Sequence, residues 1–372
     1  MNILQYYFEE LIQCAGAVYF AIFLLVALVK APHTPIYRPY RRAKWMFAGA
    51  YASLSANLFL WCLFNSGNWD DFNYNIAIAD IILFYLEYML MCNAFCVLLN
   101  KEYVTRRRIV VDFGLWGITL LTELSALLPG MAAYRNELVL LGLVMLMGYI
   151  CRFAFTFFRE YRRCKERLDN YFTEDMQRFI KWTSRSVGMC LVSWCMAIVS
   201  MYADIYFNWL LQIYVVSLHI YIVVSFINYA ERYADVALAD QGSTVAETAA
   251  DGSADVDVDE AERDTVERKI DRWLADRKYL TEQLTIDDLA KAIGTNKSYL
   301  SYHINERYGV SFSSWIAGMR IDEAKRMMRE NPDRKLESIA FSTGFSSASY
   351  FSKVFSMHEG ISPARWRSEA LS

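Results

Sequence analysis

Proline, glycine and histidine are scarce in this sequence. Its 372 residues include 6 prolines, 16 glycines and 4 histidines. Folds with many turns use glycine and proline at those turns, so their scarcity argues against a loop-rich enzyme fold. The chain also has no H-E-x-x-H zinc motif, no G-x-x-x-x-G-K-[ST] phosphate-binding loop and no G-x-S-x-G nucleophile motif. We therefore expect no enzyme, no catalytic residues and no cofactor.

Cysteine pairs with the spacing of a zinc site are absent from the sequence as well. All eight cysteines precede residue 235, and the closest pairs are Cys92/Cys96 and Cys190/Cys195. Neither pair has the C-x2-C spacing that such sites use. We expect the cysteines to pack as small apolar side chains, and we expect no metal.

The chain lacks a large net charge, but the total conceals three different segments. Residues 1–234 carry 20 basic and 17 acidic side chains, residues 235–264 carry 1 and 10, and residues 265–372 carry 17 and 14. Their net charges are therefore +3, −9 and +3, while the whole chain has −3. With 55% hydrophobic residues, the chain is neither disordered nor a small disulfide scaffold. We expect three regions with these bounds.

Long hydrophobic runs are abundant in the first region. Each of seven runs supplies about 20 mostly apolar residues, the length of helix that crosses a bilayer core of about 30 Å. They lie near residues 11–29, 45–64, 76–99, 109–128, 137–158, 187–203 and 209–229. The alternative is a large soluble core, but soluble helices seldom reach this length without a polar face. We expect residues 1–234 to form a seven-helix transmembrane bundle.

Basic and non-basic connections alternate between these runs. Residues 30–44 carry five lysines and arginines, residues 101–108 carry four, and residues 159–185 carry eight. The connections at 66–75 and around Asp204 carry none. Because basic loops stay in the cytoplasm, seven spans place the N-terminus outside and everything after the last span inside. The expected location is the bacterial cytoplasmic (inner) membrane.

Three acidic residues, Asp80, Glu87 and Glu123, lie within the expected spans. A charge at membrane depth costs at least about 2.5 kcal/mol, so such residues face the bundle interior, a cavity or each other. Asp80 and Glu87 are seven residues apart and share one helix face. One interpretation is an intramembrane signal site for a polar ligand or a proton. The other is pairing between helices, or the reach of a side chain near a span end to the membrane interface. We favour this second interpretation for Asp112 and Arg152 because they lie near span ends.

Residues 235–264 are small, acidic and free of aromatic side chains. Such a segment has too little apolar surface to fold, so we expect an acidic flexible linker. Thirty flexible residues span about 30 Å on average. Because a flexible tether cannot transmit a rigid helix movement, we expect the membrane region to act by pairing or sequestering the region that follows.

An internal repeat fills the third region. Residues 298–301 (SYLS) return 51 positions later as residues 349–352 (SYFS), and Gly309 returns as Gly360. Each copy predicts a short helix, a glycine-containing turn and a second helix pinned by apolar residues at i and i+4. The expected helices lie at 286–293 and 297–306 in the first copy, and at 336–342 and 347–356 in the second.

On these residues, the segment 268–367 resembles the DNA-binding domain of the AraC/XylS family of transcription regulators. The second copy matches the family signature at Ile339, Ala340, Gly344, Phe345, Ser349, Tyr350, Phe351, Ser352, Lys353, Phe355, Gly360, Ile361, Ser362, Pro363, Trp366 and Arg367. The first copy matches at Leu289, Ala290, Tyr299, Leu300, Ser301, Gly309, Ser311 and Phe312, and the helix that follows matches at Arg320, Ile321 and Ala324. The resemblance covers about 100 of the 372 residues.

The resemblance implies an all-helical cytoplasmic domain in which a helix near residues 313–329 joins two helix-turn-helix units. Their recognition helices would enter successive major grooves of DNA. The candidates for DNA contact are Asn296, Lys297, Ser298, Ser301, Tyr302, Asn305, Ser347, Ser349, Ser352, Lys353, Arg365 and Arg367. Hydroxyl and amide groups read base edges, whereas lysine and arginine neutralise phosphates. Many family members have arginine where this chain has Tyr302 and Lys353, so the strong guanine contact is lacking at both.

We therefore expect an all-α, membrane-anchored one-component regulator that binds promoter DNA. The implied partners are double-stranded DNA, the lipid bilayer, RNA polymerase, a second copy of the chain in a homodimer on DNA, and a signal ligand of unknown identity. A competing interpretation makes the spans a transporter or channel and the C-terminal region an interaction module. A third, a membrane enzyme with a regulatory tail, lacks any catalytic constellation.

Overall fold

The computed structural model of the chain describes residues 3–64, 73–174, 176–200, 205–250 and 260–371. Within these residues the protein is almost entirely helical and contains no β-strand, apart from one isolated bridge between Phe172 and Thr285. The expected all-α fold is confirmed. The chain divides into two compact units, one of residues 1–162 and 179–234 and the other of residues 163–178 and 235–372.

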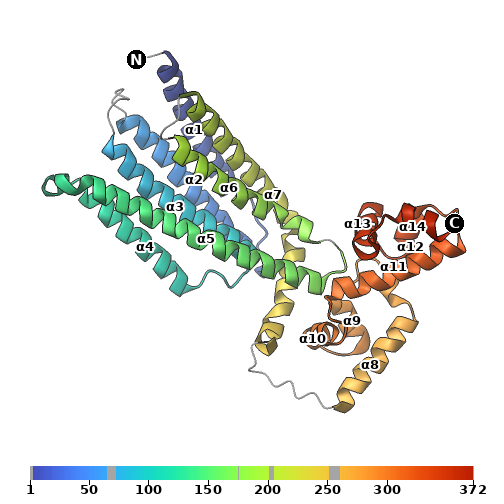
Figure 1. The fold of residues 1–372 in the computed structure, drawn as a ribbon. Helices are drawn as coiled ribbons and strands as arrows, with labels where there is room; N and C mark the ends of the chain where they lie inside the picture. Colours follow the sequence, from blue (N-terminus) through green and yellow to red (C-terminus); the bar gives the residue numbers. More distant parts are fainter. Residues whose placement is uncertain (1–2, 65–72, 175, 201–204, 251–259, 372) are drawn as a thin grey trace. The chain divides into compact units, whose positions relative to one another are not determined.

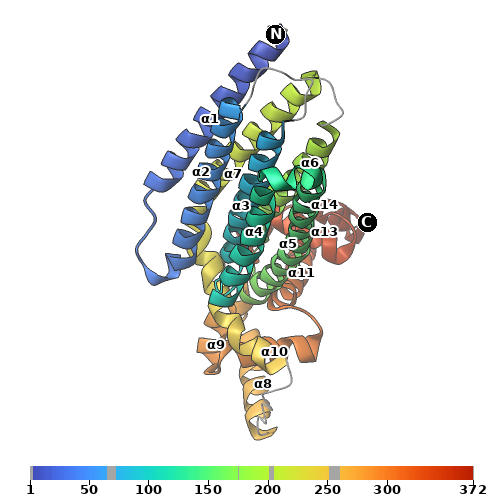
Figure 2. The ribbon, with the colours of Figure 1, turned by 90° about the vertical axis from the view of Figure 1, so that its left-hand side faces the viewer.

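The first unit is a bundle of long helices that run side by side (Figures 1 and 2). Helix α2 packs against both α1 and α3, and α3 also packs against α4. The bounds are α1 Ile3–Leu28, α2 Arg38–Phe64, α3 Tyr74–Leu99, α4 Arg106–Ser125, α5 Arg135–Tyr171, α6 Lys181–Ser200 and α7 Ile205–Ala250. The last residues of α5 and α7 belong to the second unit.

Close packing in this bundle comes from small side chains and satisfied hydroxyls. Ala43 and Ala50 of α2 are fully buried. The hydroxyl of Ser53 donates to the carbonyl of Leu83 in α3 at 2.9 Å, and that of Ser55 donates to Gly16 of α1 at 3.2 Å. Small residues let helix backbones approach, and bonded hydroxyls cost little in an apolar interior.

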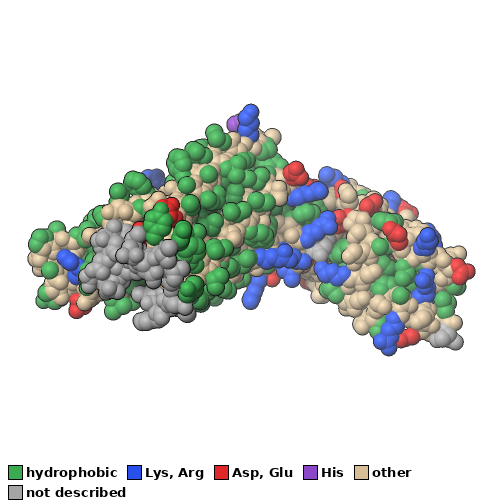
Figure 3. Space-filling model, turned by 90° about the horizontal axis from the view of Figure 1, so that it is seen from above, with side chains coloured by type: hydrophobic (Ala, Val, Ile, Leu, Met, Phe, Trp, Pro, Cys, Tyr) green, Lys and Arg blue, Asp and Glu red, His purple; other side chains and the backbone are tan. Residues whose placement is uncertain are grey.

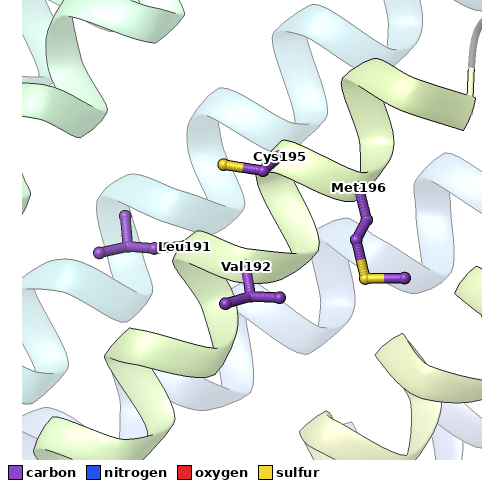
Figure 4. A pocket seen from close by; sticks show the side chains of 4 residues that line it. All are labelled: Leu191, Val192, Cys195 and Met196. Atoms are coloured by element: carbon purple, nitrogen blue, oxygen red, sulfur yellow. The ribbon is translucent and has the colours of Figure 1, made fainter.

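The outer surface of the bundle is strongly apolar. Leu28, Phe155 and Leu210 expose 77%, 72% and 65% of their surface, and Figure 3 shows hydrophobic side chains covering much of the visible face of this unit. Helix α6 adds a shallow apolar hollow lined by Leu191, Val192, Cys195 and Met196 (Figure 4). Exposed apolar patches of this extent mark surfaces that are covered by lipid or by another protein.

Five of these helical segments are long and apolar enough to cross a membrane. They are Tyr6–Leu28, Pro35–Phe64, Tyr74–Leu99, Pro129–Tyr171 and Tyr206–Ala237. Helices α4 and α6 do not qualify. Helix α4 carries three arginines at its start and the acidic residues Asp112 and Glu123, and α6 begins with Lys181 and carries Arg185. The structure thus supports several spans, whereas the count of seven stays a prediction.

The second unit consists of short helices joined by tight turns. Their bounds are α8 Glu260–Ala275, α9 Ile286–Ile293, α10 Lys297–Tyr308, α11 Phe312–Glu330, α12 Leu336–Ser342, α13 Ala348–Glu359 and α14 Pro363–Ala370. Helices α9 and α12 have the bounds that the repeat predicts. Helices α10 and α13 extend two and three residues further than expected, up to Gly309 and Gly360, whose left-handed backbones end them.

Helix α7 continues into the segment whose composition predicts a linker. It reaches Ala250, and Val236 and Ala239 are buried. Residues 251–259 of the expected linker lie outside the described residues. The division of the chain into regions at 235 and 264 stays a prediction. The first residues of the expected linker, 235–250, are helical rather than an extended coil.

Candidate nucleic-acid interface

Helices α9 and α10 form the first helix pair of the repeat. A capping box begins α9, because the Thr285 hydroxyl accepts from the backbone N–H of Asp288 while the Asp288 carboxylate accepts from the backbone N–H of Thr285. Gly294 ends α9 with φ of 72°, a left-handed backbone that favours glycine. Leu300 and Ile304 on α10 are fully buried, so the opposite face of α10 points outward.

Helices α12 and α13 form the second pair. Gly344 has φ of 83° in the turn, and a Cβ at this position would lie 2.5 Å from the carbonyl oxygen of Leu280. Phe351 and Phe355 of α13 are fully buried in a core built with Ile339, Ala340 and residues of α11. Both copies therefore hold their second helix by two buried apolar residues one turn apart, as the repeat predicts.

On α10 the expected DNA-contact residues divide into capping and outward-facing groups. The Asn296 side chain accepts from the backbone N–H of Tyr299 at 2.7 Å, so it caps the helix. Tyr302 and Asn305 are exposed, and the Tyr302 hydroxyl donates to Glu306 at 3.2 Å. Ser298 and Ser301 are half-buried.

Lys297, the first residue of α10, is less available than the sequence suggests. Its ammonium lies 3.6 Å from a carboxylate oxygen of Asp287, and 27% of its side chain is exposed. It also lies 5.4 Å from the ring centroid of Tyr171, a residue far away in the sequence. This lysine is therefore engaged within the protein in this conformation.

On α13 three of the four expected contact residues are exposed. Ser349, Ser352 and Lys353 are exposed, whereas the Ser347 hydroxyl caps the helix by accepting from the backbone N–H of Tyr350 at 3.2 Å. Ser352 and Lys353 thus lie outside the buried face that Phe351 and Phe355 form.

The two candidate arginines near the C-terminus differ in their surroundings. Arg365 is exposed and pairs with Glu369 at 2.7 Å. Arg367 is half-buried and donates to the carbonyl of Arg334 at 2.7 Å, which ties α14 to the start of α12. Arg365 thus remains accessible to a phosphate, while Arg367 also has a structural contact.

Helix α11 carries two buried charges whose structural roles the sequence does not reveal. The guanidinium of Arg320 is 1% exposed and donates to the carbonyls of Tyr279 and Thr281 at 2.8 and 2.6 Å. Burial lowers the pKa of Arg320 to about 10, and Glu174 acts in the opposite direction. The hydrogen bond from Arg326 lowers the pKa of Glu323, which also accepts from Arg277 at 3.0 Å. These pairs fix the turn between α8 and α9 against α11.

The three acids that the sequence places in expected spans, Asp80, Glu87 and Glu123, lie against three different helices. Glu87 of α3 is 2% exposed, and its carboxylate lies 3.7 Å from Nε2 of His219 on α7. The Nδ1 atom of His219 lies 3.3 Å from the Tyr19 hydroxyl of α1. The sequence places His219 in a span but gives no sign that it meets Glu87, because 132 residues separate them.

Asp80 and Glu123 lie in separate environments. Asp80 accepts from Asn57 of α2 at 2.9 Å. Glu123 is fully buried, neither of its carboxylate oxygens has a hydrogen-bond partner, and it fills the space beside Gly142 of α5. Asp112 and Arg152, for which we favour pairing between helices or a position at the membrane interface, form a salt bridge with each other. Within the described residues, no group of histidine, cysteine and carboxylate side chains could hold a metal ion.

Comparison with known proteins gives matches to the C-terminal part of the chain. Residues 289–369 match the family model of a helix-turn-helix domain. The chain is 35% identical over 98 residues to the uncharacterized HTH-type transcriptional regulator YisR of Bacillus subtilis, which covers 26% of this chain and 34% of that protein. It is 29% identical over 91 residues to the regulatory protein PocR of Salmonella typhimurium, covering 24% and 30%. It is 28% identical over 96 residues to the probable transcription factor PqrA of Proteus vulgaris, covering 26% and 78%.

The chain spans about a third of the length of the first two of these relatives. No solved structure matches it. The names of these relatives describe regulators of transcription rather than enzymes, in agreement with the expectation that this chain is no enzyme. By these comparisons, residues 289–369 are similar to the helix-turn-helix domains of transcription regulators, as the resemblance of their motifs to the AraC/XylS family predicts.

Proposed function

We propose that this protein is a membrane-anchored transcription regulator that binds promoter DNA through two helix-turn-helix units. The observation that carries the proposal is the paired architecture of α9–α10 and α12–α13. Each pair has a glycine with positive φ in its turn and a second helix whose buried apolar residues leave a polar face outward. Two such units on one support can enter successive major grooves, about 34 Å apart along the duplex.

The outward faces of α10 and α13 suggest which residues would contact bases and which would contact phosphates. Ser349 and Ser352 of α13 and Asn305 of α10 carry groups that can hydrogen-bond base edges. Lys353 and Arg365 can neutralise phosphates, and two further candidates, Asn296 and Ser347, cap the helices that present these groups. Since neither α10 nor α13 has an arginine at its exposed N-terminal turns, we expect a modest affinity per unit. Binding as a homodimer would raise it.

The membrane part of the proposal rests on the apolar bundle and its basic loops. Five segments could cross a membrane, and the long helices α4 and α6 complete seven spans if their charged ends lie at the membrane surface. Seven spans with basic connections inside put the C-terminal unit in the cytoplasm of a bacterial cell, where DNA and RNA polymerase are. Glu87 with His219 and Tyr19 is the candidate signal site, since buried ionisable groups in a span mark functional sites.

The test is selection of DNA by the full chain in lipid nanodiscs. We expect the protein to enrich a defined sequence from a pool of random duplexes and to prefer it over a scrambled duplex. Lys353→Ala should weaken binding to both duplexes and reduce the dependence of log affinity on log salt by about 1. Ser352→Ala should reduce the preference for the selected sequence instead.

Lys278→Ala is the matched control. Lys278 lies on the turn after α8, is 55% exposed and pairs with Asp276 at 3.0 Å, so its loss removes one positive charge from the same unit without touching α13. We expect little change in the affinity for either duplex or in its dependence on salt. Equal binding of selected and scrambled duplexes by the wild-type chain would overturn the proposal and favour a transporter or channel with a C-terminal interaction module.

A further inference from the structure

The residues that follow α5 pack against the C-terminal domain. Residues 163–178 belong to the same compact unit as residues 235–372. The backbone N–H of Thr173 donates to the carbonyl of Leu284 at 3.3 Å, and its hydroxyl donates to the same oxygen at 2.8 Å. Phe172 forms an antiparallel bridge with Thr285, and Thr173 is 2% exposed. We call residues 171–174 the docking segment.

The docking segment contacts the N-terminal ends of both candidate recognition helices. The ring of Tyr171 lies against the ammonium of Lys297, the first residue of α10. The carbonyl of Thr173 accepts from the hydroxyl of Tyr350, in the first turn of α13, at 3.5 Å. Recognition helices present their N-terminal residues to the DNA, so the docking segment occupies the end from which a duplex would be approached.

The surroundings of Lys297 also indicate that the docking segment limits access of DNA to α10. Lys297 is held between the Asp287 carboxylate and the Tyr171 ring, and such a lysine has fewer positions from which to reach a phosphate. Glu174 places its carboxylate near the buried guanidinium of Arg320. The docking segment therefore places a bulky ring beside Lys297, at a surface that must accept a polyanion.

We propose that the docking segment is a cis-acting cover that competes with DNA for the N-terminal ends of α10 and α13. The proposal rests on the proposed function, because it names the regulation of the same DNA-binding surface. In the docked form Lys297 is withheld and DNA affinity is low. Release of the segment frees Lys297 and Tyr350 and raises the affinity.

The cover is connected directly to the membrane bundle. Helix α5 runs without a break from Arg135 to Tyr171, and α6 begins at Lys181. A shift of α5 against its neighbours therefore moves the docking segment, with no need to transmit a movement through residues 235–264. This route is independent of pairing or sequestration through a flexible tether.

The experiment uses the full chain in nanodiscs with Thr173→Asp, which puts a charge in a buried site and undocks the segment. The probes are a selected duplex and a scrambled duplex, and the readouts are affinity and amide hydrogen exchange of residues 171–174. We expect Thr173→Asp to speed exchange in this segment and to raise DNA affinity at least about fivefold, the lower end of common allosteric couplings. The rise would occur although the new charge is negative. Thr281→Asp, an exposed threonine of the same unit, adds the same charge and should not raise the affinity.

The wild-type chain provides a second measurement that needs no variant. Saturating duplex should speed exchange of the Thr173 amide, because DNA displaces the segment; unchanged or slower exchange overturns the proposal. Faster exchange in Thr173→Asp with unchanged or lower DNA affinity also overturns the cover proposal. In that case, sequence-selective binding by the wild type would leave the proposed function intact. If neither chain binds any duplex, the proposed function fails and the cover proposal fails with it.

Discussion

At the scale of single residues, two buried charged side chains of the C-terminal unit, Arg320 and Glu323, each have more than one hydrogen-bond partner. Arg320 satisfies two backbone carbonyls, and Glu323 accepts hydrogen bonds from Arg277 and Arg326. Removing one partner leaves a buried polar group without a hydrogen bond. The resulting loss of stability is larger than the net contribution of the intact pair. These residues hold the turn before α9, the turn on which the docking segment also rests.

Glu323 gives a pH-dependent prediction. The Arg326 hydrogen bond holds the pKa of Glu323 below its ordinary value, so its contribution to stability is complete above the glutamate pKa of about 4.3 and disappears as the pH falls through the lowered folded-state pKa. Glu323→Gln should lower the free energy of unfolding by about 1–3 kcal/mol at pH 7, and the difference from wild type should shrink towards pH 3. Urea-dependent proteolysis of the full chain measures both.

Glu330→Gln is the control for this variant, because Glu330 pairs with the same Arg326 but is 52% exposed. An exposed pair contributes about 0–1 kcal/mol, so we expect a small effect. A pH-independent loss of stability in Glu323→Gln would show that the ion pairs are not its cause.

At the scale of elements, the helix pairs owe their shape to glycines in left-handed turns. Gly294, Gly309, Gly344 and Gly360 all have positive φ. The motif alone predicts that glycine is required in these turns, since side chains disfavour this backbone conformation. The motif does not predict that Gly344 also lies against the backbone of the turn after α8, because that contact depends on how α12 packs onto a distant part of the chain.

Two glycine variants separate these effects. Gly309→Ala meets only the left-handed penalty of about 1–2 kcal/mol, since nothing lies near its Cβ. Gly344→Ala meets that penalty and also a clash with the Leu280 carbonyl, which adds about 1–3 kcal/mol as overpacking does. Unfolding free energies of both variants, from the same proteolysis experiment, should therefore differ clearly. Equal decreases in the unfolding free energy would mean that the backbone near Leu280 moves aside without destabilising the protein.

At the scale of the whole molecule, the number of spans decides on which side of the membrane each connection lies. Five qualifying segments and seven long helices both leave an odd number of crossings. The two counts reverse the sides of the connections on either end of α5. The connection between α5 and α6 is cytoplasmic with seven spans and outside if α4 and α6 do not cross. The cover proposal needs this connection on the same side as DNA.

Cysteine labelling distinguishes the two counts. In a chain whose eight natural cysteines are replaced, Lys165→Cys near the end of α5 should resist a membrane-impermeant maleimide in intact cells and react after permeabilisation. Asn75→Cys at the start of α3 should react from outside in both conditions. Both positions are exposed, and eight basic residues at 159–185 favour the cytoplasmic side for Lys165. Labelling of Lys165→Cys from outside would reject seven spans.

The sequence by itself determined the features that depend on local pattern. Hydrophobic runs of span length, the bounds of α9 and α12, and the apolar pairs that pin α10 and α13 follow from the period of the helix and from turn chemistry. The outward position of Ser352 and Lys353 follows from the same period. The caps are different: Asn296 and Ser347 have residue types typical of caps, but the helical period alone places Ser347 inside its helix and both residues among the DNA contacts.

Only the tertiary structure decided which distant groups meet. Glu87 faces His219, Gly344 lies against Leu280, and the residues after α5 dock on the turn before α9 and on Lys297. No local period encodes these contacts, because each joins segments that packing alone brings together. For this reason a helical wheel shows Lys297 as an exposed cation, whereas in the folded protein it contacts Asp287 and Tyr171. Under the cover proposal, its availability to DNA depends on a segment more than a hundred residues away in the sequence.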